Sequence, residues 1–112
     1  MKKNNRDKKK GLEKKEIFGN DLNIYTCDVN SNNVFYCANG DSFKNIMDLG
    51  NSLDLMDDET FAHHVNFEKN DFATWVYDVI GDVELANTLR ELENLEDTKR
   101  EVRIRIKFLG GN

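Results

Sequence analysis

The stretch NDFATWVYDVIGD, residues 70–82, carries the strongest amphipathic pattern in this chain of 112 residues. Its apolar residues recur at i, i+3, i+4, i+7 and i+8, the spacing of one helix face. These residues are Phe72, Trp75, Val76, Val79 and Ile80. Asn70 or Asp71 is placed to cap the start of this helix, and Gly81 to end it. We expect Trp75 in the core, with Asp71 as a candidate partner for its indole N–H.

Helical spacing continues on both sides of this stretch. Asp82 is a candidate N-cap for the next helix. The inner face of that helix is expected to consist of Leu85, Ala86, Leu89 and Leu92. Further upstream, Asp41 or Ser42 is placed to cap another amphipathic helix. Its apolar face is formed by Phe43, Ile46, Met47, Gly50 and Leu53.

A short helix is predicted between this upstream helix and the helix that begins at Asn70 or Asp71. It is capped by Asp57 or Asp58. Phe61 and Val65 are expected on its inner face, and Asn66 as a left-handed residue that ends it. The chain contains no proline, so Asx residues and glycines must make the turns.

The two flanks of the helical region have strand-like patterns. Residues 22–29 and 34–38 are rich in aromatic and β-branched residues and are separated by the polar run NSNN, which predicts a β-hairpin. Residues 99–109 alternate apolar and basic side chains like a strand. However, Thr98 and Glu101 match a capping box, and we therefore favour a helix there. The expected fold class is α+β, mainly α: an N-terminal β-hairpin followed by a compact bundle of four to five short helices.

Charge divides the chain into three parts. Residues 1–15 carry a net charge of +6, residues 16–98 carry −15, and residues 99–112 carry +4. Residues 1–20 are expected to form a disordered basic tail and residues 21–109 a single small domain. No apolar run approaches the length of about 18–20 residues needed to span a membrane, and we expect a cytoplasmic protein.

The adjacent histidines are the first candidates for chemistry. Helical spacing places His64 inward, where it is expected to bond the open carbonyls at the helix end, and His63 outward as a possible binding residue. A zinc site with Cys27 and Cys37 is disfavoured, because the cysteines are ten residues apart and the histidines adjacent. The cysteines are expected to be thiols. If the hairpin loop is symmetric about Asn32, they lie opposite each other, and an oxidised sample could contain a disulfide between them.

No catalytic, cofactor-binding or metal-binding residue is predicted. A structural role is instead expected for a set of residues around the corner between the second and third helices. This set consists of His64, Asn66, Asn70, Asp71, Phe72, Trp75 and Asp78.

Three segments together resemble a small domain family of unknown function found in archaea and bacteria. They are N-G-x-x-F-x-N-I-x-D-L from Asn39, HHVN from His63, and N-D-F-A-x-W-V-x-D-V-I-G-D from Asn70. The likeness covers about residues 34–92, and N-D-F-x-x-W is its specific part. It implies a compact, mainly helical unit, and it implies no activity.

Three functions are compatible with these patterns. The favoured one is a non-enzymatic interaction module that presents an acidic face to a protein partner. The second is weak association with nucleic acid through the basic ends, Lys2–Lys15 and Arg100–Lys107. The third is a small metal-dependent or acid–base enzyme at His63 and His64, although no nucleophile or phosphate-binding motif accompanies them.

Deleting residues 2–15 is expected to leave the fold intact, because Leu12 is the only apolar residue in that segment. The same deletion should abolish any binding of nucleic acid, because the remaining acidic chain repels phosphate. Thermal melts and gel shifts of both proteins test this expectation. A large fall in melting temperature, or binding that survives the deletion, would contradict it.

Overall fold

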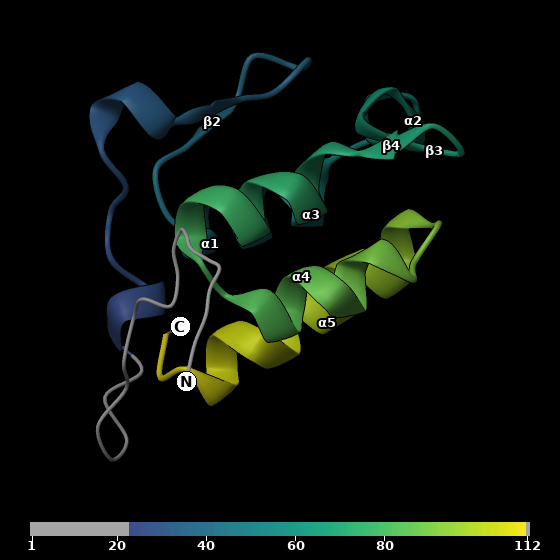
Figure 1. Cartoon of the computed structure of the whole chain (residues 1–112). Coiled ribbons are helices and arrows are strands. Elements are labelled where there is room, and N and C mark those ends of the chain that lie inside the picture. Colours follow the sequence, from purple (N-terminus) through teal and green to yellow (C-terminus); the bar gives the residue numbers. More distant parts are fainter. Residues whose placement is uncertain (1–22, 112) are drawn as a thin grey trace.

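The computed structural model describes residues 23–111, and the predicted tail of residues 1–20 lies outside them. The described part contains five α-helices and two short antiparallel hairpins, which confirms the mainly helical α+β class. In Figure 1 the hairpins lie toward the top of the view, and α4 and α5 pack alongside one another below α3. The α-helices are α1 (Ile46–Leu55), α2 (Asp58–His64), α3 (Asp71–Trp75), α4 (Val83–Arg90) and α5 (Leu95–Phe108). The strands are β1 (Phe35–Tyr36), β2 (Ser42–Phe43), β3 (Val65–Asn66) and β4 (Lys69–Asn70).

The N-terminal hairpin differs from the prediction in its strands. It pairs Phe35 with Phe43 and Tyr36 with Ser42, so the second predicted strand is in fact the first. The turn comes later because Gly40 adopts a left-handed φ of 95°. The predicted first strand, residues 22–29, was wrong over residues 23–29, which contain the short 3-10 helix η1 (Asn23–Tyr25) and no strand. A second 3-10 helix, η2 (Ser31–Asn33), lies in the predicted turn.

Helix α1 begins later than predicted. Neither Asp41 nor Ser42 caps it, because Ser42 belongs to β2 and Asp41 accepts a 2.6 Å hydrogen bond from Ser52. The cap is Asn45, whose side chain accepts from the amide of Asp48 at 2.8 Å. For α2, the prediction of Asp57 as cap is confirmed, since it accepts from the amide of Thr60.

The predicted third helix is continuous but changes its winding. After α3 the chain continues as a π-helix, η3 (Val76–Ile80), and the Gly81 amide donates to the Val76 carbonyl at 2.8 Å. Gly81 then ends the helix with a φ of 89°, as predicted. Asp82 caps α4, also as predicted.

The C-terminal segment is a helix, as favoured, but the predicted capping box was wrong. The N-cap of α5 is Asn94, which accepts from the Asp97 amide at 2.8 Å. Thr98 lies one turn into the helix and is 1% exposed. Helix α5 packs along α1, where a Cβ on Gly50 would meet Ile106 at 2.7 Å.

The core is built around aromatic rings from the first hairpin, α2 and α3. Phe72 on α3 lies 5.4 Å from Phe35 and 6.1 Å from Phe61, and Phe35 stacks on Phe43 at 5.1 Å, measured between ring centroids. The first hairpin and α2 therefore both pack on α3. No helix among residues 23–111 is long and apolar enough to cross a membrane.

A buried ion pair joins the start of α4 to the end of α5. Asp82 is 1% exposed, and Arg105 donates to both of its carboxylate oxygens at 2.8 and 3.0 Å. Burial disfavours the charged guanidinium, yet the hydrogen bonds to Asp82 together with the negative charges of Asp82 and Glu84 outweigh this and raise the pKa of Arg105. Asp82, predicted from the sequence as an N-cap, is thus also a buried residue that is paired with Arg105.

Replacing Arg105→Met is expected to lower the free energy of unfolding by about 3–5 kcal/mol, because it leaves the Asp82 carboxylate buried without a counter-ion. The matched control is Arg103→Met, which breaks the exposed pair of Arg103 and Asp54. That pair should contribute about 1 kcal/mol or less. Urea unfolding of both variants measures the difference, and equal losses would contradict the assignment.

Candidate functional site

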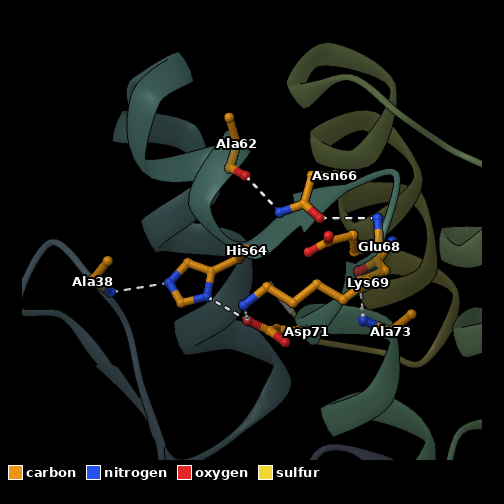
Figure 2. A network of polar contacts seen from close by, with 9 residues as sticks. Ala38, Ala62, His64, Asn66, Glu68, Lys69, Asp71 and Ala73 are labelled. Carbon is orange, nitrogen blue, oxygen red and sulfur yellow. Dashed lines mark hydrogen bonds and ion pairs between the residues drawn. The ribbon is translucent and has the colours of Figure 1, made fainter.

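The corner between α2 and α3 is a miniature β-hairpin. Val65 pairs with Asn70 and Asn66 with Lys69, and Phe67 and Glu68 form the turn. Asn66 is an extended strand residue and not the predicted left-handed cap. Its side chain nevertheless bonds the C-terminal end of α2, because the side-chain amide of Asn66 donates to the Ala62 carbonyl at 3.0 Å (Figure 2). Its oxygen accepts from the amide of Glu68, which closes the turn.

Asn70 fixes the other side of this hairpin. It is the N-cap of α3 and accepts from the amide of Ala73 at 2.9 Å. Its side-chain amide also donates to the carbonyl of Leu89 at 3.0 Å, near the end of α4. Of the two candidate caps, the structure therefore selects Asn70, and Asp71 has a different role.

His64 is buried, 5% exposed, and lies between two separate parts of the chain (Figure 2). Its Nε2 accepts from the backbone amide of Ala38 at 3.0 Å, and its Nδ1 lies 2.9 Å from a carboxylate oxygen of Asp71. We assign the ring hydrogen to Nδ1, because a nitrogen that accepts an amide hydrogen carries none itself. The prediction that His64 points inward is confirmed, and the expected bonds to open carbonyls were wrong.

Asp71 is the acceptor that holds this ring in place. It also receives the Lys69 ammonium at 2.9 Å. Burial alone would raise the pKa of Asp71, but the hydrogen bonds from Lys69 and His64 outweigh burial and place it below its ordinary value. Lys69 was not predicted, although it lies only two residues before Asp71 in the sequence.

The other predicted residues separate into core and surface. Phe72 is fully buried, and Trp75 is 7% exposed. The Trp75 indole donates to the carbonyl of Asn33 at 2.8 Å, and not to Asp71 as predicted. Asp78 and His63 lie at the surface. The exposed His63 ring contacts the His64 ring edge-on, with 4.9 Å between the ring centroids, so His63 borders the corner.

The cysteines do not face each other across a hairpin. Cys37 is a buried core thiol, and Cys27 is exposed on the segment before η2. Within residues 23–111 no group of three or more His, Cys, Asp and Glu is arranged to hold a metal ion. The Nε2 of His64 is already occupied by the Ala38 amide, so this ring presents no lone pair to a substrate in this conformation.

A groove of about 540 Å³ lies beside the β3–β4 hairpin. Its apolar lining comes from Val65, Phe67 and Leu92, and its charged rim contains two basic and two acidic residues. These charged residues are Lys69, Arg90, Glu68 and Glu93. Phe67 stands at the hairpin tip and is 98% exposed. Phe67 was not singled out from the sequence. The signal for it was an aromatic residue directly after an Asx residue, Asn66, in a short turn.

The basic residues of the C-terminal helix are largely paired with carboxylates. Arg100 contacts Asp97 at 3.0 Å, and Arg103 contacts Asp54 at 2.6 Å. Arg105 is held by buried Asp82. Helix α5 therefore presents fewer unpaired cations than its sequence indicates, and Lys2–Lys15 lies outside the described residues.

Comparison of the chain with protein-family models, curated proteins and solved structures finds no match in any of the three.

The lowered pKa of Asp71 predicts a defined pH dependence. Its contribution to stability is present above the unfolded-state pKa, about 3.9, and is lost as the pH falls through the lower folded-state value. The stability difference between wild type and Asp71→Asn should be constant from pH 7 to about 5, and should shrink below about pH 4. Urea unfolding across this range measures it.

Two comparisons sharpen this test. The pKa values of Asp57 and Asp97 are also lowered, by hydrogen bonds from Thr60 and Asn94. Both carboxylates are present in wild type and in Asp71→Asn, so their contributions to the free energy of unfolding cancel in the difference. In Lys69→Met one donor to Asp71 is lost, so the folded-state pKa of Asp71 is lowered less, and the decline should be smaller and should be complete at a higher pH. A difference that does not change with pH would show that Asp71 acts without its charge.

Proposed function

We propose that this protein is a non-catalytic, cytoplasmic interaction module that binds a protein partner through the tip of the β3–β4 hairpin. One observation carries the proposal. Phe67 is 98% exposed at the tip of a hairpin that side-chain hydrogen bonds hold on both sides. Large aromatic side chains that project beside a groove are typical anchors of protein interfaces.

The rigidity of the hairpin supports a binding role. Asn66 bonds both α2 and the turn, and Asn70 bonds both α3 and α4. Lys69 and His64 converge on Asp71 beneath them. A turn held in this way loses little conformational entropy when a partner binds, so more of the contact energy appears as affinity.

The composition of the groove favours protein over nucleic acid. Two carboxylates, Glu68 and Glu93, offset the two cations on its rim, and phosphate would meet no net positive charge there. A few apolar side chains within a mixed polar rim are common in protein interfaces. The favoured ligand is a protein segment that places an apolar side chain against Val65 and Leu92, with Phe67 packed over it.

Phe67→Ala is expected to leave the free energy of unfolding unchanged and to weaken partner binding at least tenfold, as expected for an interface anchor. The full-length protein is first used to capture a partner from the native host. Binding of that purified partner is then measured by calorimetry for wild type, Phe67→Ala and Leu55→Ala. Leu55 is the matched control, because it is 91% exposed at the end of α1 and away from the groove lining.

Equal affinity of wild type and Phe67→Ala for that partner would contradict this site. Salt-sensitive capture of nucleic acid that does not depend on Phe67 would favour the second hypothesis, binding through the basic ends. Loss of binding in Leu55→Ala alone would move the contact surface to the end of α1.

A further inference from the structure

We propose, on the basis of the binding role given above to the β3–β4 hairpin, that the protein partner is basic. Its lysine or arginine side chains pair with the carboxylates of Glu68 and Glu93, which line the groove, and lie beside the ring of Phe67. The basic partner rests on the proposed function, because it names the chemistry of the segment that binds at that same groove.

The cations at this groove already have partners within the fold. The Lys69 ammonium lies 2.9 Å from a carboxylate oxygen of Asp71. The Arg90 guanidinium lies over the Tyr77 ring, 5.0 Å from the ring centroid, and donates to the side-chain oxygen of Asn87 at 3.1 Å. An anionic ligand would have to compete with these contacts for either cation.

The carboxylates at the same groove have no such partner. Glu68 and Glu93 are both exposed, and neither forms an ion pair with any residue between 23 and 111. Once Asp71 has neutralised Lys69, the remaining formal charge around the groove is negative, because these two carboxylates outnumber Arg90. Complementary charge on a partner is therefore positive.

Two other grooves of the described chain lack such free carboxylates. In the groove of about 270 Å³ between α4 and α5, Glu84 and Glu101 lie 3.5 and 3.7 Å from arginine side chains of α5. In the groove of about 410 Å³ between α1 and α5, Asp54 is bonded to Arg103, and Lys107 adds a positive charge. A basic segment is therefore matched better by the hairpin groove than by either of these.

The Phe67 ring adds a second attraction for a cation. Its exposure of 98% leaves both faces of the ring open. One face can pack over the apolar side chain that contacts Val65 and Leu92, and the other can receive a guanidinium or ammonium group. The chain makes such a contact itself where the Arg105 guanidinium lies 5.0 Å from the centroid of Phe108. A basic residue close to an apolar one thus satisfies the ring, the carboxylates and the apolar lining together.

The charge of the domain acts in the same direction. Residues 16–98 carry a net charge of −15. A negative potential of this kind draws a basic segment towards the protein and raises the rate of association, most strongly at low ionic strength. The local pairing at the groove then determines where on the acidic surface that segment binds.

The test uses the full-length protein and a phage library of random peptides. Peptides are selected on immobilised wild type while soluble Phe67→Ala is present in excess, which removes peptides that bind any other surface. We expect the selected sequences to be enriched in lysine and arginine close to an apolar residue. In fluorescence polarisation, synthetic copies of these peptides should bind wild type at least tenfold more tightly than Phe67→Ala.

Replacing both carboxylates, Glu68→Gln together with Glu93→Gln, should weaken binding of the same peptides about tenfold, as expected for the loss of two exposed ion pairs. It should also reduce the dependence of binding on salt. The matched control is Glu59→Gln together with Asp78→Asn, which removes the same charge from exposed positions outside the groove lining. At physiological salt this control should bind like wild type, because distant charges are screened.

The outcomes separate the basic partner from the binding site itself. Peptides that depend on Phe67 but carry no excess of basic residues, or that bind the Glu68 and Glu93 double variant as tightly as wild type, would overturn the basic partner and leave the hairpin site standing. Equal losses in the double variant and in the control would also overturn it, since the charge of the whole domain would then explain the attraction. A selection that yields no peptide dependent on Phe67 would overturn the hairpin site and the basic partner together.

Discussion

The imidazole of His64 is the constraint on which the rest of the domain depends. It is buried among Phe35 and Phe72, and both of its nitrogens are used within the protein. One nitrogen holds the loop after β1 through the Ala38 amide, and the other holds the start of α3 through Asp71. A buried polar ring is stable only when both nitrogens are satisfied, so these two segments must come together for the core to close. The same arrangement positions the β3–β4 hairpin and its exposed phenylalanine.

Local features of the fold could be predicted because they depend on neighbouring residues. The start of α2 at Asp57 and the cap of α4 at Asp82 each follow from one side chain and the amides next to it. The stop at Gly81 follows from the left-handed backbone conformation that glycine adopts easily. The inward position of His64 followed from helical spacing alone. Where two caps were adjacent, as at Asn70 and Asp71, the pattern left both open. In the structure Asn70 is the cap, because the Asp71 carboxylate is bonded to His64 and Lys69.

Features that depend on distant residues were not predictable. Ala38 is 26 positions from His64, Asn33 is 42 from Trp75, and Arg105 is 23 from Asp82. No periodicity connects such pairs, because they meet only through the tertiary fold. The capping box at Thr98 failed for a related reason. Asn94 offers an earlier cap, and the extra turn lets Leu95 enter the core, so tertiary burial overrode the local motif.

The π-helical turn after Trp75 sets the register between the two halves of the domain. A π turn holds one residue more than the α turn that it replaces, and each residue of an α-helix advances the chain by about 100° around the axis. If the same residues wound as a regular α-helix, the extra residue would turn Asp82 by about that angle, away from Arg105. The π turn absorbs this residue, and the contact between the start of α4 and the end of α5 therefore depends on how the segment winds as well as on how many residues it contains.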